Sequence, residues 1–262
     1  VNQTKGVSFT QTGTAADASG MTYSWSMQTG PGVVTFGSSS AVSTTISASV
    51  DGTYTIRFTA TDTAGNSSYS DMTLVWDTAI PTVNIGSPSA TITKAGPVTY
   101  TVTYAGADTI ALSDANIVLN KTLTANGTVA VSGTTGNTRT VTISGITGDG
   151  TLGISIGSGT ASDIAGNLAA ASGASATFTV DNTVPVVSAG VNQTKGVSFT
   201  QTGTAADASG MTYSWSMQTG PGVVTFGSSS AVSTTISASV DGTYTIRFTA
   251  TDAAGNSSYS DM

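Results

Sequence analysis

Large apolar side chains alternate with small polar ones along most of this chain. The segment MTYSWSMQ at 21–28 places a large side chain at every second position, and GTYTIRFTATD at 52–62 repeats the alternation. The same pattern returns at 98–104, 141–143 and 152–156. A period of two is typical of strands with one buried face and one solvated face. No segment sustains a helical period, so the pattern predicts an all-β protein.

Short turn signals separate these predicted strands. Gly-Pro-Gly at 30–32, Asp-Gly at 51–52 and Asn-Gly at 126–127 recur at the spacing expected of a two-layer sandwich. We therefore expect immunoglobulin-like β-sandwich domains, with Trp25 buried on a central strand and Tyr54 near a corner of the fold.

An internal repeat organises the chain. Residues 1–72 recur at 191–262 with one substitution, Thr63 against Ala253. Unlike sequence lies between the two copies, so two kinds of module alternate. A repeat of this kind indicates an array. The fold class is therefore predicted as all-β, with tandem immunoglobulin-like β-sandwich domains in an extended array.

Two Asp-to-Pro segments mark the predicted domain boundaries. WDTAIP at 76–81 and VDNTVP at 180–185 each end a strand with Asp and fix the entering backbone with Pro. The predicted domains are residues 1–77, 78–182 and 183–262.

The two copies differ in what flanks them. TVPVVSAG leads into the last domain and TLVWD closes the first, whereas the first domain has no such lead-in and the last has no such closing segment. The chain thus resembles a window cut from a longer repetitive protein. The alternative is that identical chains in a fibre supply the missing edge strands by strand addition.

Composition excludes most catalytic chemistry. The chain has no His and no Cys, and its fourteen acidic residues are all Asp. A Ser-His-Asp triad, a thiol nucleophile and a zinc site of His and Cys therefore have no ligands or bases, and we expect no enzyme. The chain has only seven Lys and Arg residues and a net charge of -7. This charge argues against binding to nucleic acid or to anionic membranes. The expected partners are other repeats of the same protein.

One turn recurs in all three domains and is the candidate site. It reads Asp-x-Ala-Gly-Asn at 62–66, 163–167 and 252–256. One interpretation is conformational, because Asp and Asn hydrogen-bond to nearby backbone and Gly permits a positive φ. The other is a calcium site at each domain junction, because acids of the linker would meet acids of the turn and calcium binds carboxylate and carbonyl oxygens. No other cofactor is expected.

The calcium interpretation names specific ligands. Asp77 would approach Asp163 and Asn167 at the first junction. At the second junction the ligands would be Asp181, Asp207 of the AADASG loop, Asp252 and Asn256, and the equivalents in the first domain are Asp17, Asp62 and Asn66.

The residues of the outer domains resemble a known family. GTAADASGMTYSWSMQTGPGVVTF and DGTYTIRFTATDTAGNSS are similar to PKD-like modules, especially the variant beside REJ-type repeats. TYTVTYAGADTIALSDANIVLN and FTVDNTVP in the middle domain resemble a bacterial Ig-like repeat of giant surface adhesins. The resemblance implies an extracellular stalk or spacer on a bacterial cell surface.

Two functions therefore remain open from the sequence. The first is a structural repeat segment of a large bacterial cell-surface adhesin or extracellular fibre, which calcium at the junctions would rigidify. Near-identity of the copies favours it, because a spacer needs only length. The alternative is an adhesive module that binds glycan or protein through the loops at one end of a sandwich.

Overall fold

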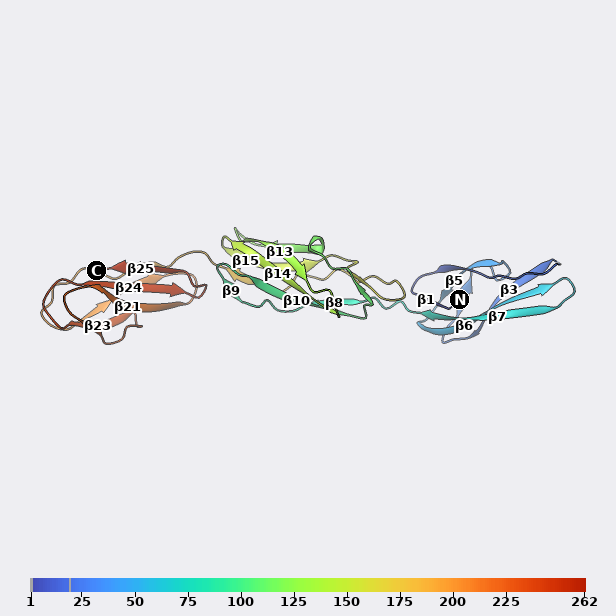
Figure 1. The fold of residues 1–262 in the computed structure, drawn as a ribbon, viewed down its shortest axis with the longest axis horizontal. Helices are drawn as coiled ribbons and strands as arrows, with labels where there is room; N and C mark the ends of the chain where they lie inside the picture. Colours follow the sequence, from blue (N-terminus) through green and yellow to red (C-terminus); the bar gives the residue numbers. More distant parts are fainter. Residues whose placement is uncertain (1, 19) are drawn as a thin grey trace.

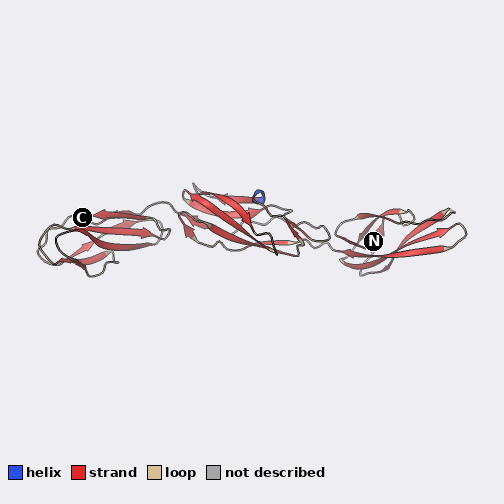
Figure 2. Ribbon diagram, viewed as in Figure 1, coloured by secondary structure: helices blue, strands red, loops and turns tan. Residues whose placement is uncertain are grey.

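The computed structural model describes residues 2–18 and 20–262 and consists of three β-sandwiches placed end to end (Figure 1). Figure 2 shows strands in every domain, and the one helical element of the described residues is the short 3-10 helix η1 (Asp114–Asn116). The prediction of an all-β array of immunoglobulin-like sandwiches is confirmed. The described residues contain no helix that is both long and apolar enough to cross a membrane.

The first domain packs two sheets around one core. One sheet has the order β1-β7-β6-β3 and the other β2-β5-β4. Trp25 of β3 lies 4.7 Å from Phe58 of β6, ring centre to ring centre. Its strand ends its sheet, so the expectation of a central strand is wrong. The strands are β1 (Gln3–Lys5), β2 (Phe9–Thr12), β3 (Met21–Thr29), β4 (Val34–Phe36), β5 (Ser43–Ala48), β6 (Gly52–Asp62) and β7 (Ser67–Trp76).

The middle domain has its own core. Its two main sheets have the orders β13-β14-β10-β8 and β12-β15-β17-β9. The alternating apolar residues of β10 and β15 are all buried between them. The strands are β8 (Thr82–Ile85), β9 (Ile92–Thr93), β10 (Val98–Ala105), β11 (Thr109–Ile110), β12 (Ile117–Lys121), β13 (Asn126–Ser132), β14 (Thr138–Thr147), β15 (Gly150–Ile156), β16 (Ala161–Ser162) and β17 (Phe178–Val180).

The third domain repeats the first with different edges. Its sheets are β21-β24-β25, β19-β23-β22 and the pair β18-β20. Its core gathers around Trp215 and Phe248, the counterparts of Trp25 and Phe58. The strands are β18 (Val186–Ser188), β19 (Phe199–Thr202), β20 (Thr204–Ala206), β21 (Met211–Thr219), β22 (Val224–Phe226), β23 (Ser233–Ala238), β24 (Thr245–Asp252) and β25 (Ser257–Asp261).

The corner expected at Tyr54 is present. The Tyr54 ring is fully buried, and its hydroxyl donates a 2.6 Å hydrogen bond to the backbone carbonyl of Val50, four residues upstream. Tyr244 makes the same bond to Val240 at 2.7 Å. A hydroxyl at the end of a buried ring needs such a partner, and the bond holds the turn that precedes β6.

Candidate functional site at the domain junctions

The Asp-x-Ala-Gly-Asn turn has the same geometry in all three domains. In the third domain, Asp252 accepts hydrogen bonds from the backbone N–H and the side-chain amide of Asn256, each at 2.8 Å. Gly255 between them has a φ of 88°. This left-handed backbone suits glycine because a Cβ would crowd it. The turn is thus held by its own side chains, as the conformational interpretation requires.

At the first junction this turn also holds the linker. The side-chain amide of Asn167 donates to the backbone carbonyl of Asp77 at 2.7 Å, while it also bonds Asp163. The carboxylate of Asp77 accepts from the N–H of Ala79 at 3.0 Å, within its own segment. The structure therefore brings Asp77 and Asn167 together through the Asp77 backbone.

The second junction repeats this contact. The amide of Asn256 donates to the backbone carbonyl of Asp181 at 2.8 Å, and the carboxylate of Asp181 accepts from the N–H of Thr183. The side chain of Lys94 adds a bond across the junction to the carbonyl of Gly255. Each junction thus uses one asparagine to fix the chain that enters its domain.

Three carboxylates gather at the second junction. Asp181, Asp207 and Asp252 each place an oxygen within 4.8 Å of the others, and in residues 2–18 and 20–262 they form the one such group of three. Asp252 is only 6 % exposed. Asp207 also accepts from the N–H and hydroxyl of Ser209. The acids named from the sequence for this junction are therefore neighbours in space.

The first junction has a different arrangement. Asp163 bonds the amide of Asn167, but the cluster of three carboxylates found at the second junction has no counterpart here among the described residues. The nearby Asp108 accepts from the N–H of Ile164, in the same turn, at 2.9 Å. Asp108 could not be predicted from the sequence, because it lies 55 positions before Asp163 and no motif surrounds it.

In the first domain the equivalent turn has no linker packed on it within the described residues. Asn66 bonds Asp62 as its counterparts do, at 2.8 Å. Asn66 is exposed, whereas Asn256 is 7 % exposed. Asp17 is exposed, whereas Asp207 is half-buried. These residues have the geometry of the turn without the burial that a junction brings.

Hydrogen bonds set the charge state of the turn acid. Burial pushes the pKa of Asp252 upward, but the hydrogen bonds from Asn256 and the neighbouring backbone amides outweigh burial, so the net pKa is lowered. The pKa of Asp62 is lowered chiefly by the side-chain hydrogen bond from Asn66. Both groups stay ionised in neutral solution and favour a cation nearby.

This lowered pKa predicts a pH dependence. An acid whose folded pKa is depressed adds stability above its unfolded pKa, near 3.9, and loses it as the pH falls through the folded value. We expect Asp252→Asn to lower the free energy of unfolding at pH 6. The difference in that free energy between wild type and variant is expected to shrink as the pH falls. Urea unfolding between about pH 2.5 and pH 6 measures this, with Asp241→Asn, an exposed acid, as the control. An equal deficit at every pH would contradict the prediction.

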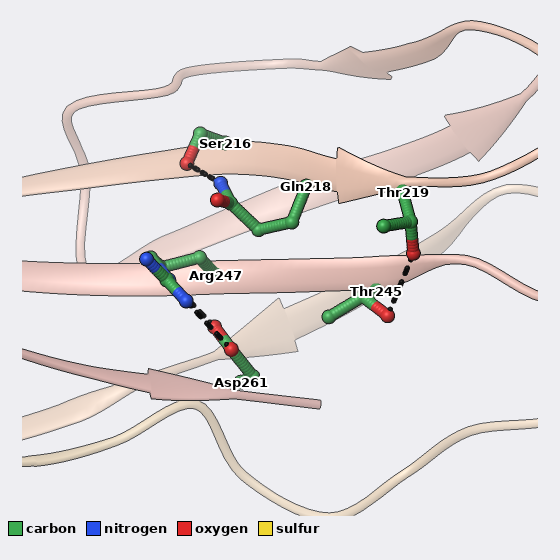
Figure 3. Close-up of polar contacts among 6 residues, drawn as sticks. All are labelled: Ser216, Gln218, Thr219, Thr245, Arg247 and Asp261. Atoms are coloured by element: carbon green, nitrogen blue, oxygen red, sulfur yellow. Dashed lines mark hydrogen bonds and ion pairs between the residues drawn. The ribbon is translucent and has the colours of Figure 1, made fainter.

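The first and third domains each carry an arginine, on the outer face of β6 and of β24, that the sequence did not single out. In Figure 3, Arg247 makes a bidentate ion pair with Asp261, both bonds at 2.8 Å, while Gln218 bonds Ser216 beside it. The guanidinium of Arg247 stacks 3.5 Å from the ring centre of Tyr259. The first domain repeats this arrangement with Arg57, Asp71 and Tyr69.

Comparison with known proteins gives a family match and several similar folds. The model of the K319L-like PKD domain matches residues 1–75 and 188–262, more than half of the chain. No curated protein matches the chain. Similar solved structures include mouse cadherin-23 EC22-24, at 17 % identity, covering 100 % of this chain and 92 % of that one with a TM-score of 0.34. The I9-I11 tandem of titin is 10 % identical and covers 99 % of this chain and 94 % of that one, with a TM-score of 0.32. Protocadherin gammaB7 EC3-6 is 16 % identical and covers 100 % of this chain and 70 % of that one, with a TM-score of 0.31.

The family match falls on both copies of the repeat, which carry the turn and the outer-face arginine described above. The chain is therefore a tandem of PKD and immunoglobulin-like repeats, and it belongs to the K319L-like PKD domain family.

Proposed function

We propose that this chain is a structural spacer segment of a large bacterial cell-surface adhesin or extracellular fibre. The observation that carries the proposal is the repeated junction, in which Asn167 and Asn256 each bond the backbone of the entering linker. A spacer must transmit a direction from one domain to the next. A side-chain bond to a backbone carbonyl does so without a ligand, because it fixes the linker in one position.

The separate cores support the same role. Each domain has its own cluster of buried apolar residues, and the three lie in a row along the long axis (Figure 1). Length is then added one domain at a time. The sequence has no His and no Cys, and its acidic residues are all Asp. This composition fits a segment that positions other parts of a protein.

The junction asparagines test the spacer proposal. Asn167→Ala and Asn256→Ala remove the bond to the linker along with the bond inside the turn, whereas Asn66→Ala removes only the latter. We expect all three to lose about 1 kcal/mol of domain stability. The two junction variants alone are expected to broaden the distribution of interdomain distances in small-angle scattering. An unchanged distribution in both would contradict the spacer proposal.

Calcium at the second junction is the finer part of the proposal. Asp181, Asp207 and Asp252 together bring three negative charges, and the Lys94 ammonium that bonds Gly255 offers only one positive charge to the same turn. Carboxylate oxygens are the ligands calcium prefers. The ion would neutralise the cluster and hold the linker, the loop of Asp207 and the turn of Asp252 together.

Calcium titration separates this site from the rest of the chain. We expect one ion to bind with a dissociation constant in the range of about 10⁻⁴ to 10⁻³ M that is typical of extracellular modules. Asp207→Asn is expected to weaken binding about tenfold, whereas Asp17→Asn, its counterpart in the first domain, is expected to leave binding unchanged. Isothermal titration calorimetry, in which calcium is added to protein freed of calcium with a chelator, measures the dissociation constant of each variant. If both variants lost calcium affinity equally, or if no calcium bound, the calcium site would be rejected and the spacer proposal would be unaffected.

The outer face favours one alternative, a glycan-binding module. Tyr69 and Tyr259 are 62 % and 58 % exposed beside Arg and Asp side chains, and aromatic rings with polar neighbours can stack on sugars. A glycan array probed with the chain, and with the Tyr69→Ala and Tyr259→Ala double variant, distinguishes the two functions. Binding that the double variant abolishes would favour the alternative.

A further inference from the structure

A groove of about 650 Å³ lies at the second junction, between the middle and third domains. The middle domain contributes residues 122–123 and 149–151 to its lining, and the third domain contributes residues 206–209. The linker between the two domains adds Val184, and β18 adds Val186. A volume of this size falls in the range of about 300–1,000 Å³ that is typical of ligand sites.

The aliphatic side chains of this groove are open to solvent. Leu123 is 88 % exposed, Val186 is 76 % exposed and Val184 is 53 % exposed. Single exposed valines are common on protein surfaces, but several large apolar side chains that line one hollow mark a contact site. The groove therefore offers apolar surface that a partner can cover.

The turn that carries Leu123 is held in a fixed shape. Thr122 and Thr124, on either side of it, exchange backbone and hydroxyl hydrogen bonds with Thr151 and Asp149 at 2.8–3.0 Å. Leu123 has a φ of 51° and is the one non-glycine residue with a positive φ in the part of the chain that the structure describes. Leucine is strained in this region, and such strain persists only where the surrounding structure imposes it. The turn thus presents Leu123 to solvent in one position.

The other walls of the groove are also fixed. The N–H of Asn182 donates to the carboxylate of Asp149 at 2.6 Å, and the side-chain amide of Asn182 donates to the carbonyl of Gly148 at 2.7 Å. These bonds hold the linker on the middle domain. On the third domain, Val186 of β18 pairs with Ala206 of β20. The groove is therefore formed before a partner arrives, which lowers the entropic cost of binding.

The charged part of the lining is acidic. Asp149, Asp181 and Asp207 line the groove, and the described lining contains no lysine or arginine. The side chains of Lys94 and Lys121, from neighbouring segments, bond groups outside this lining. A second copy of the chain would bring a net charge of -7 to these acids. The groove is instead complementary to a partner that is both basic and aliphatic.

We propose that this groove is a docking site for an extended segment of a partner protein, in which a lysine or arginine lies two positions from a large aliphatic residue. Side chains two positions apart point to the same side of an extended chain. The basic group bonds Asp181 and Asp207, and the aliphatic side chain packs against Leu123 and Val184. The site goes beyond the spacer role and does not require calcium, which would compete for the same two carboxylates.

Peptide binding tests the docking site directly. The probe is a labelled peptide of the sequence Ser-Leu-Ser-Lys-Ser-Leu-Ser, titrated into the full 262-residue chain with a chelator present and followed by fluorescence anisotropy. We expect saturable binding that weakens as salt is added, because salt screens ionic contacts. Peptides with Glu in place of the lysine, or with Ser in place of both leucines, are expected to bind at least about tenfold more weakly. Equal binding of the three peptides, or no binding of the first, would overturn the proposal.

Variants of the chain locate the binding. Leu123→Asn removes the aliphatic side chain and suits the left-handed backbone, so it is expected to weaken peptide binding about tenfold while the domain stays folded. Val223→Asn, at an exposed valine outside the groove, is the control and is expected to leave binding unchanged. The melting temperature of each variant without peptide shows that the domains are intact. If the two variants bound the peptide equally well, the peptide would lie elsewhere and the docking site would be rejected.

Photocrosslinking finds the site without a substitution in the chain. A peptide with a photoactivatable leucine in place of its second leucine is expected to crosslink to residues 122–124 or 183–186, as mapped by mass spectrometry. Crosslinks confined to other segments would contradict the proposal.

Sedimentation velocity of the chain without peptide tests a second copy as the occupant. We expect a monomer, because the groove and the whole chain are both acidic. A dimer that Leu123→Asn dissociates would show that a second copy fills the groove, and the partner segment proposed here would be wrong.

Discussion

Trp25→Ala is expected to unfold or severely destabilise the first domain and to leave the middle domain unchanged. The Trp25 side chain is 4 % exposed, and its ring packs on Phe58 at 4.7 Å. Its indole N–H donates to the carbonyl of Ala41 at 3.0 Å. Truncation therefore leaves a cavity and an unpaired carbonyl, and such changes cost about 3–5 kcal/mol. For a domain of this size that is most of the stability.

Scanning calorimetry of the full chain measures the effect. A loss of about 3–5 kcal/mol lowers the melting temperature of a small domain by roughly 15 °C or more. One transition should therefore move while the transition of the middle domain stays in place, because the clusters around Trp25 and around Tyr100 share no residue.

Two comparisons make this result specific. Trp215→Ala is expected to move the transition of the third domain in the same way, since Trp215 packs on Phe248 at 4.6 Å. Val33→Ala, at a side chain that is largely exposed, is expected to change nothing measurable. If Trp25→Ala shifted all transitions together, the three domains would form one cooperative unit and independent domains would be ruled out.

The strand pattern was readable from the sequence because burial alternates with chain position. The large residues of 52–62 that alternate with threonine occupy the inner face of β6, and Arg57 points outward as its phase requires. The position of a strand within its sheet was not readable. Trp25 lies on β3, at the end of its sheet, because sheet order is set by pairing between distant segments and not by local pattern.

The candidate site shows the same division. The sequence brought Asp181, Asp207 and Asp252 into one hypothesis, because a repeated turn and a linker must meet wherever domains follow each other. It did not indicate that the asparagine of the turn would bond a backbone carbonyl of the linker. Every residue has such a carbonyl, so no side-chain motif marks the one that is used.

The two copies of the repeat show a further limit. Asn66 and Asn256 have the same neighbours in sequence but differ in burial, because the segment that precedes the third domain covers one of them. Sequence reasoning assigns the same role to identical residues. The burial of each asparagine depends on what packs against it, and the local sequence does not show that.

Gly6→Ala is expected to disrupt the first junction, whereas Gly196→Ala is expected to be silent. Gly6 follows β1, whose last residue Lys5 accepts a bond from the N–H of Asp77. A Cβ at Gly6 would lie 2.1 Å from the side-chain oxygen of Asn167 and 2.4 Å from the carbonyl of Asp77. Neither contact is tolerable, and the carbonyl belongs to the backbone that Asn167 holds.

The methyl group forces the residues around Gly6 to shift, and we expect the linker and the Asn167 turn to separate. Overpacking of this kind costs about 1–3 kcal/mol, and here relief comes from breaking the bond between Asn167 and Asp77. The free energy of unfolding of each domain should change by less than about 1 kcal/mol, while the angle between the first two domains becomes variable. The effect thus concerns orientation more than folding.

Gly196 is the matched control because it is the copy of Gly6 in the third domain and has no heavy atom within 4 Å of the position a Cβ would take. Any intrinsic effect of replacing this glycine in its local sequence is the same at both sites, and in open space it is neutral or slightly stabilising. Spin labels on cysteines introduced into the first and middle domains measure the distance distribution. A broad distribution for Gly6→Ala with a narrow one for Gly196→Ala would show that close packing of Gly6, Asp77 and Asn167 sets the direction of the array. Equally narrow distributions would mean that the linker holds its direction without this contact.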